Sequence, residues 1–268
     1  MANSPSQCLS RWLRSPLGER LLEEEAACLG EAARRFHGDT LLWAGCHEQV
    51  AQTVRGCMVR HRLYASAEPA DAVEDLSRLQ CSLDALPLPN NSLDAMVLHH
   101  ALETCPDPRG GLREAARVLV PGGRLVICAF NPLSLWGLRR AYARLCNDAF
   151  SGLRLVTSLR LLDWLALLGF EPHGQVRYLS YSLPFYLGDA PRPQSGRVGR
   201  ALSRLQPPVG GVYVIVVTKQ AAALRPHWRT PRVKSPSLVP AAYPKSAVQR
   251  EPAPVLYLRD WKDLGRND

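Results

Sequence analysis

Apolar positions along the chain recur in alternating helical and strand-like runs. The clearest helical pattern covers residues 15–36, where Ser15 and Pro16 mark the start and leucine and alanine recur at helical spacing. A short apolar run follows at 41–45 and ends in glycine, and residues 48–56 have the composition of a further helix. The order of these runs predicts a helix, a strand, a turn and a second helix.

The same alternation continues towards the C-terminus. The most apolar run is 124–130, a composition typical of a strand that is covered on both faces of a parallel sheet. Such strands alternating with helices favour a three-layer, doubly wound α/β sheet, with a ligand at the carboxyl ends of the strands. The other expected strands are 58–64, 79–82, 93–99, 170–179 and 212–218, and the other expected helices are 108–119, 135–145 and 158–168.

Composition divides the chain into a folded part and a tail. The 268 residues are 46% hydrophobic, which is enough for a sizeable core and excludes wholesale disorder. After Lys219 the chain carries seven prolines and no apolar periodicity. We therefore expect an N-terminal arm at 1–14, a domain at 15–219 with an insertion at 180–211, and a disordered Pro/Arg-rich tail at 220–268.

The formal charge of +9 is concentrated in that tail. Residues 220–268 hold nine basic and four acidic side chains, a net of +5, which leaves +4 for the rest. If the chain contacts nucleic acid, the tail is the segment that would do so. Codon usage rich in G and C would also raise the arginine content, and composition alone leaves both interpretations open.

The eight cysteines are scattered, with no CxxC pair and no His/Cys spacing of a zinc site. They are typical of free thiols in a reducing compartment, and we expect no metal. The first residues lack the apolar stretch of a secretory signal, and no window approaches the ~18 apolar residues of a membrane span. These features predict a cytoplasmic protein without a membrane partner.

One stretch carries a specific motif. Residues 81–103 read CSLDALPLPNNSLDAMVLHHALE, and residues 112–125 read LREAARVLVPGGRL. In order and spacing they resemble the class I S-adenosylmethionine-dependent methyltransferases of the type 11 group, and the resemblance extends over roughly 17–219. It implies a seven-stranded, Rossmann-like methyltransferase sheet with an antiparallel last strand, and S-adenosylmethionine as the cofactor. No GxGxxG follows a strand, which argues against a nicotinamide dehydrogenase.

The expected cofactor loop departs from the family pattern. Members of the family place an acidic residue and then several glycines after the first strand, whereas residues 41–49 read LLWAGCHEQ. Only Gly45 remains, Trp43 takes the acidic position, and His47 and Gln49 replace glycines. Side chains therefore stand where the family brings bare backbone against the cofactor.

The resemblance implies a set of cofactor contacts. Asp84 would accept a hydrogen bond from the adenine amino group while Leu86 covers the ring, although an aspartate here is also typical of a turn. Glu68 is the carboxylate nearest the end of the second strand, where the family grips the ribose hydroxyls. The full set of candidate cofactor-binding residues is Gly45, Cys46, Glu68, Asp84, Ala85, Leu86 and His99.

Two adjacent histidines, His99 and His100, end the expected strand at 93–99. In the family, acceptor and methyl group meet at this edge, so both are candidate catalytic bases, and histidine titrates near neutral pH. A methyltransferase needs such a base only when its nucleophile carries a proton. The alternative is that strand alternation sends one ring into the core and the other to the cofactor rim, without chemistry.

Two hypotheses follow. The first is an S-adenosylmethionine-dependent methyltransferase with an unidentified methyl acceptor. The second is a catalytically silent methyltransferase-like protein that binds or regulates, with nucleic acid as a possible partner of the tail. Titration with the cofactor discriminates between them, and the oligomeric state is left open by the sequence.

Overall fold

The computed structural model describes residues 4–45, 47–68, 76–146, 149–181 and 207–221. The chain divides into two units, Met1–Leu224 and Arg225–Asp268, of which the second lies outside the described residues. Cys46, most of the expected insertion and nearly all of the expected tail also lie outside them. Within the described part, no helix is long and apolar enough to cross a membrane.

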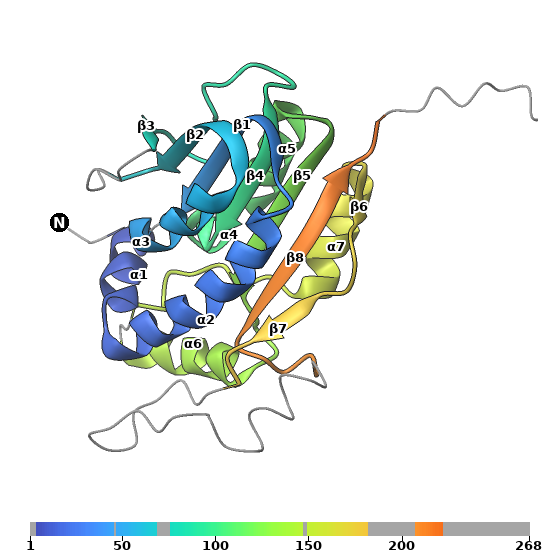
Figure 1. The fold of residues 1–268 in the computed structure, drawn as a ribbon. Helices are drawn as coiled ribbons and strands as arrows, with labels where there is room; N and C mark the ends of the chain where they lie inside the picture. The colour runs from blue at the N-terminus through green and yellow to red at the C-terminus, as the bar shows by residue number, and fades with distance from the viewer. Residues whose placement is uncertain (1–3, 46, 69–75, 147–148, 182–206, 222–268) are drawn as a thin grey trace, which may run out of the picture. The chain divides into compact units, whose positions relative to one another are not determined.

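A single mixed sheet forms the middle layer (Figure 1). Its order is β3-β2-β1-β4-β5-β8-β6, with β7 also paired to β8. Strands β1 to β5 pair in parallel, and β8 runs antiparallel to β5, β6 and β7. The strands are β1 (His37–Gly45), β2 (Met58–Ser66), β3 (Ser77–Gln80), β4 (Leu93–His99), β5 (Leu119–Phe130), β6 (Phe170–Pro172), β7 (Arg177–Leu179) and β8 (Val212–Lys219). The α/β class and the antiparallel last strand are confirmed.

The expected strand at 170–179 is wrong in one respect, because it is two short strands. Pro172 ends β6 since it has no N–H for the ladder, and Gly174 has a φ of 89°, outside the extended region. The described sheet therefore has eight strands rather than seven. Both pieces pair with β8 in antiparallel fashion.

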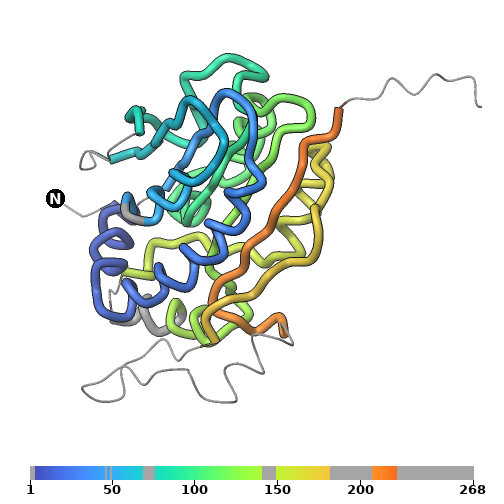
Figure 2. The backbone as a smooth tube through the Cα atoms, in the orientation of Figure 1, coloured from blue at the N-terminus to red at the C-terminus, as the bar shows by residue number. Residues whose placement is uncertain are grey.

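Helices cover both faces of the sheet (Figures 1 and 2). One apolar cluster joins α1, α2 and the first face, and a second joins α5, α7 and the other face. The helical segments are α1 (Pro5–Leu13), α2 (Pro16–Ala33), α3 (Glu48–Ala51), η1 (Gln52–Gly56), α4 (Ala101–Thr104), α5 (Pro108–Val118), α6 (Leu135–Cys146) and α7 (Ser158–Leu167). The expected three-layer arrangement is confirmed.

Residues 1–14 were expected to be an arm, but they contain helix α1. Ser4 caps the helix in a capping box with Gln7, and Pro5 occupies its first turn. Leu9 and Leu13 are fully buried in the same cluster as the core of α2. The helix has only nine residues, so its packing rather than its own propensity holds it in place.

The strand register brings three chain segments to one edge. Gly45 at the end of β1 lies opposite His99 at the end of β4, and His99 lies opposite Cys128 of β5. Parallel strands end at the same edge of a sheet, so the loops after β1 and β4 meet there. Helix α2 packs over these strand ends on one face, and α4 begins directly after His100.

Candidate functional site

A small hollow lies at the carboxyl ends of β1, β2 and β4, with a volume of about 60 Å³. The strand ends that border it carry small side chains, so backbone and methyl groups form much of its wall. Its lining comprises Ser6, Ala44, Gly45, Ala65, Ser66, Ala67, Cys81, Ser82, Leu83, Leu86, Ala101, Thr104, Cys105 and Pro106. In open α/β sheets, ligands bind at this edge.

Helix α1 borders this hollow through Ser6 and is fixed to Glu68 nearby. The Ser4 hydroxyl donates a hydrogen bond to Glu68 Oε1 at 2.7 Å, and Gln7 Nε2 donates to Glu68 Oε2 at 2.9 Å. Both carboxylate oxygens of the expected ribose ligand are therefore engaged by the first helix.

The expected adenine end is only partly assembled. Leu86 is buried and lines the hollow, whereas Asp84 is half-buried and Ala85 exposed, and neither lines it. Asp84 accepts a hydrogen bond from the hydroxyl of Ser82, which does line the hollow. The backbone N–H of Leu86 donates to Glu114 of α5 at 3.1 Å, which fixes this loop against the helix.

Gly45 has a structural reason as well as an expected cofactor role. A Cβ at Gly45 would lie 2.7 Å from the backbone oxygen of His99 and 3.2 Å from Trp43 Nε1. Trp43, which stands at the family's acidic position, is fully buried, and its Nε1 has no hydrogen-bond partner among the described residues. Close packing of β1 against β4 therefore requires a glycine at this position.

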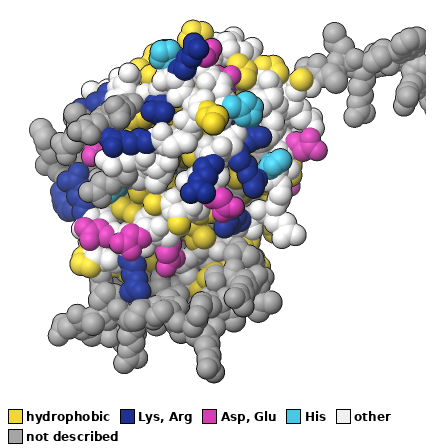
Figure 3. All heavy atoms as spheres, viewed as in Figure 1, with side chains coloured by type: hydrophobic (Ala, Val, Ile, Leu, Met, Phe, Trp, Pro, Cys, Tyr) yellow, Lys and Arg dark blue, Asp and Glu magenta, His cyan; other side chains and the backbone are white. Residues whose placement is uncertain are grey.

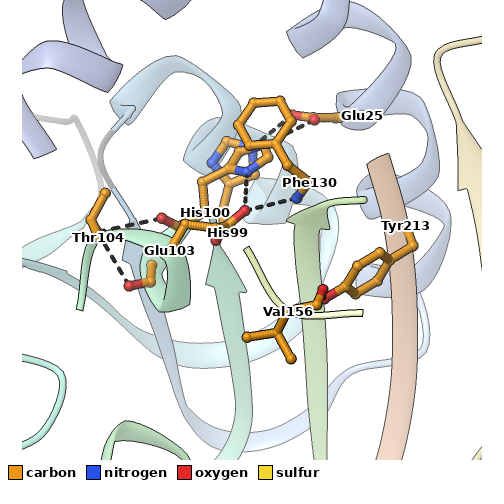
Figure 4. Close-up of polar contacts among 9 residues, drawn as sticks. Glu25, His99, His100, Glu103, Thr104, Phe130, Val156 and Tyr213 are labelled. Atoms are coloured by element: carbon orange, nitrogen blue, oxygen red, sulfur yellow. Dashed lines mark hydrogen bonds and ion pairs between the residues drawn. The ribbon is translucent and has the colours of Figure 1, made fainter. Parts of the chain in front are cut away.

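Beside the hollow, two histidines and two glutamates form a buried polar cluster (Figure 4). His99 Nε2 lies 2.8 Å from Glu25 Oε2, and His100 Nε2 lies 3.0 Å from Glu25 Oε1. The second nitrogen of His100, Nδ1, lies 2.9 Å from Glu103 Oε1. The network joins the end of β4 to α2 and α4.

The backbone at His100 explains why both rings reach Glu25. Successive side chains of a strand point to opposite faces, so adjacent histidines would ordinarily be separated. His100 has a φ of 50°, in the left-handed region that non-glycine residues seldom adopt. This conformation ends the strand and directs both rings into the interior.

Burial and charge act in opposite directions on this network. Burial alone would lower the pKa of His100, but the carboxylates of Glu25 and Glu103 outweigh it and raise the pKa to about 10. Burial would raise the pKa of Glu25, but the imidazoles, that of His100 above all, lower it to about 2. The pKa of His99 is lowered, with burial as the main cause. At neutral pH the cluster holds an ionised Glu25, an imidazolium at His100 and a neutral His99.

Glu103 extends the network to the next strand. Its Oε1 also accepts a hydrogen bond from the backbone N–H of Phe130 at 2.8 Å. Its backbone oxygen accepts one from the N–H of Arg154 at 2.8 Å. The end of β5 is thereby fixed to the same group of side chains as the end of β4.

Glu25, His99, His100 and Cys128 are all residue types that ligate metals, and their ligand atoms lie within 4.8 Å of one another. The two nitrogen–oxygen distances of 2.8 and 3.0 Å are hydrogen-bond lengths. Adjacent ligands of a tetrahedral zinc ion lie farther apart, at roughly 3.3 Å or more, given bonds of about 2.0–2.1 Å. These distances identify the contacts between Glu25 and the two histidines as hydrogen bonds.

The structure separates the sequence-based candidates into two groups. Gly45 and Leu86 line the hollow, while His99 and His100 are fully buried and do not line it. A catalytic role for either histidine stays a prediction.

Sequence reasoning missed Glu25 and Glu103, which hold the histidines. One signal was available for Glu25, because it stands four residues from both Leu21 and Leu29 and thus on the apolar face of α2.

Fold and site together define the class I methyltransferase architecture: a parallel sheet with an antiparallel last strand and a hollow at the ends of its first strands. Residues 38–127 match the family model described as a methyltransferase domain. This match covers about a third of the chain and supports its similarity to the class I S-adenosylmethionine-dependent methyltransferases of the type 11 group.

Individual proteins resemble the chain over part of its length. It is 34% identical over 168 residues to YafS of Escherichia coli (strain K12), which is described as uncharacterized, covering 63% of each chain. It is 30% identical over 137 residues to the ubiquinone/menaquinone biosynthesis C-methyltransferase UbiE of Roseobacter denitrificans, covering 51% of this chain and 52% of that one. The chain thus spans less than two thirds of the length of these relatives.

A solved structure shows the same fold at low sequence identity. It is an S-adenosylmethionine-dependent methyltransferase from Thermotoga maritima, described as a possible histamine N-methyltransferase. The TM-score is 0.53 at 17% identity, over 75% of this chain and 92% of that one. At this identity the likeness supports the fold alone.

Proposed function

We propose that this protein is an S-adenosylmethionine-dependent methyltransferase whose cofactor binds in the hollow at the ends of β1, β2 and β4. The observation that carries the proposal is the wall of small side chains, including Ala44, Gly45 and Ala65, at the edge where α/β sheets bind ligands. The methyl acceptor is unidentified.

The residues around the hollow fit a nucleoside cofactor in kind. Leu86 offers an apolar surface for a base, and Ser82 offers a polar atom in the lining. We propose that the carboxylate of Glu68, which now accepts hydrogen bonds from Ser4 and Gln7, exchanges them for the ribose hydroxyls. The volume of about 60 Å³ is far below the roughly 300–1,000 Å³ of ligand pockets, so the hollow must widen to admit the cofactor. Helix α1, which borders the hollow through Ser6, is the element that we propose moves outward.

The cofactor, when bound, supplies a methyl group on a sulfonium, which is intrinsically activated for transfer. The protein's part is then to bind, orient and exclude water, for which α1 is placed as a cover. Of the two candidate bases, the neutral His99 is the one able to accept a proton, because His100 is already an imidazolium. We propose His99 as the base if the acceptor carries a proton.

Calorimetric titration of the full chain with S-adenosylmethionine and S-adenosylhomocysteine tests the proposal. We expect saturable binding, and the Ala101→Leu variant should weaken it because the larger side chain enters the hollow. The Ala116→Leu variant, on α5 outside the lining, is the matched control. An absence of binding by the wild-type chain at millimolar ligand would overturn the proposal.

The silent, methyltransferase-like alternative is favoured by the buried Trp43 at the family's acidic position. It predicts that the titration shows no cofactor binding while the chain remains folded. Contact of the 220–268 tail with nucleic acid is a separate proposal. It predicts retention on RNA or DNA that falls steeply with salt and is lost when the tail is deleted.

A further inference from the structure

A second and larger hollow lies over the face of the sheet that α2 covers, and it shares no lining residue with the hollow at the ends of β1, β2 and β4, here called the cofactor hollow. The volume of this second hollow is about 410 Å³, within the range of ligand pockets. It opens between the C-terminal half of α2 and β8, close to the start of β5. Its lining comprises Cys28, Glu31, Ala32, Arg35, Arg124, His173, Gly174, Gln175, Arg177, Val214 and Val216.

The floor and the rim of this hollow differ in character. Val214 and Val216 of β8 and Ala32 of α2 are apolar and belong to, or pack on, the core cluster of this face. The rim carries the guanidinium groups of Arg35 and Arg124, together with that of Arg177. Figure 3 shows Lys and Arg side chains gathered among hydrophobic ones on the face that carries α2 and β8.

Two of these guanidinium groups are held in place by the protein itself. Arg177 Nη1 donates to Glu31 Oε2 at 2.6 Å, and Arg124 Nη1 donates to the backbone oxygen of Arg35 at 2.6 Å. Each of these contacts uses one of the five N–H groups of a guanidinium. With three arginines and one glutamate, the lining carries a formal charge of two positive units.

A cationic rim over an apolar floor selects for ligand chemistry. Guanidinium groups bind carboxylate and phosphate through charge-assisted, often bidentate hydrogen bonds. An apolar floor adds to the binding free energy only if the ligand also has an apolar body that covers it. A polyanion such as nucleic acid would match the rim but leave the valine floor uncovered.

We propose that the second hollow binds a small amphipathic anion, with its acidic headgroup on Arg35, Arg124 and Arg177 and its apolar body over Val214 and Val216. This site is separate from the hollow at the ends of β1, β2 and β4, because the two share no lining residue. Carboxylate and phosphate headgroups share the required chemistry, and the choice of probes distinguishes them.

The test is a calorimetric titration of the full chain with dodecanoate and dodecyl phosphate, each below its micellar concentration, and with dodecanol below its solubility limit. We expect saturable binding of one or both anions and much weaker binding of the uncharged dodecanol. The stronger anion identifies the headgroup. Equal binding of dodecanol, or no binding of either anion, would overturn the proposal.

Charge variants locate the binding. Replacing both Arg124 and Arg177 with glutamine should weaken anion binding by about tenfold or more, because each guanidinium would lose a charge-assisted hydrogen bond to the headgroup. The matched control replaces Arg60 and Arg113, exposed arginines outside the hollow, with glutamine and removes the same charge. An equal loss in the control would show non-specific attraction and overturn the site.

A variant of the floor separates the headgroup effect from folding. Ala32→Glu places a carboxylate at the half-buried edge of α2, where it should repel an anion, while Ala32→Gln has nearly the same shape without the charge. We expect the glutamate variant to lose binding and the glutamine variant to keep more of it. Thermal unfolding of both shows that each is folded, and equal affinities would contradict the proposal.

Discussion

The buried Glu25–His100 pair predicts a large and specific loss of stability in the Glu25→Gln variant. Both side chains are fully buried, and an amide at position 25 would leave the imidazolium of His100 with Glu103 as its carboxylate partner. His99 would also lose its bond to a charged oxygen. The substitution preserves shape, so the change in stability reports the charge and the hydrogen bonds rather than a cavity.

The magnitude follows from the burial. Removing one partner of a buried ion pair typically costs about 3–5 kcal/mol, because the other charge remains desolvated. Native domains are stable by about 5–15 kcal/mol, so the loss would be a large part of the total. Part of the cost would be relieved if His100 released its proton, which would appear as a smaller loss at higher pH.

Equilibrium unfolding in urea at neutral pH measures this effect, with the denaturant slope as a check on two-state behaviour. The matched control is Glu31→Gln on the same helix, where the glutamate is exposed and pairs with Arg177 on the surface. We expect the control to unfold close to the wild type. If Glu25→Gln loses no more stability than Glu31→Gln, the buried pair is not ionised as described.

Three further predictions follow from the same structure. The pKa of His100 is raised to about 10, so the stability that its imidazolium contributes is complete below pH 6.5 and is lost as the pH rises through 10. In measurements of unfolding free energy against pH, a His100→Gln variant should not show this loss of stability at alkaline pH. Gly45→Ala should cost about 1–3 kcal/mol of unfolding free energy through overpacking and lower the thermal unfolding midpoint, because its Cβ would lie 2.7 Å from a backbone oxygen of β4. The control is Gly56→Ala, whose Cβ meets nothing within 4 Å, and equal midpoints for the two variants would refute the close packing. Ser4→Ala removes the N-cap of α1 and a hydrogen bond to Glu68, so it should cost about 1 kcal/mol of stability. If α1 covers the cofactor hollow, the same variant should bind the cofactor more strongly in calorimetry, and unchanged or weaker binding would argue against a cover.

The fold was predictable because its signals are local. The helix at α2 has a Ser-Pro start, and the apolar run of β5 is readable from neighbouring residues. The start of β5 at Leu119 lies five residues before the expected strand, since Pro121 and two glycines were interpreted as the end of a helix. Helix α1 was missed because nine residues give too few turns for periodicity, although its capping box was present.

The site was less predictable because its contacts are distant in sequence. Glu25 meets His99 and His100 across 74 and 75 positions, and no local pattern reports such a pairing. Strand alternation predicts opposite directions for adjacent histidines, and the positive φ of His100 overrides it. Backbone conformation, which depends on the packed environment, therefore decided where the rings lie.

Two residues of the expected cofactor loop that depart from the family pattern, Trp43 and His47, are buried. The ring of Trp43 lies 5.5 Å from that of His99, and His47 is buried, with burial and the nearby His99 lowering its pKa to about 4. Neither residue lines the cofactor hollow, whereas Ala44 and Gly45 do. Trp43 replaces the acidic residue of the family pattern and His47 replaces one of its glycines, but both side chains are buried. Neither Trp43 nor His47 therefore fills the hollow at the ends of β1, β2 and β4, although both depart from the family pattern.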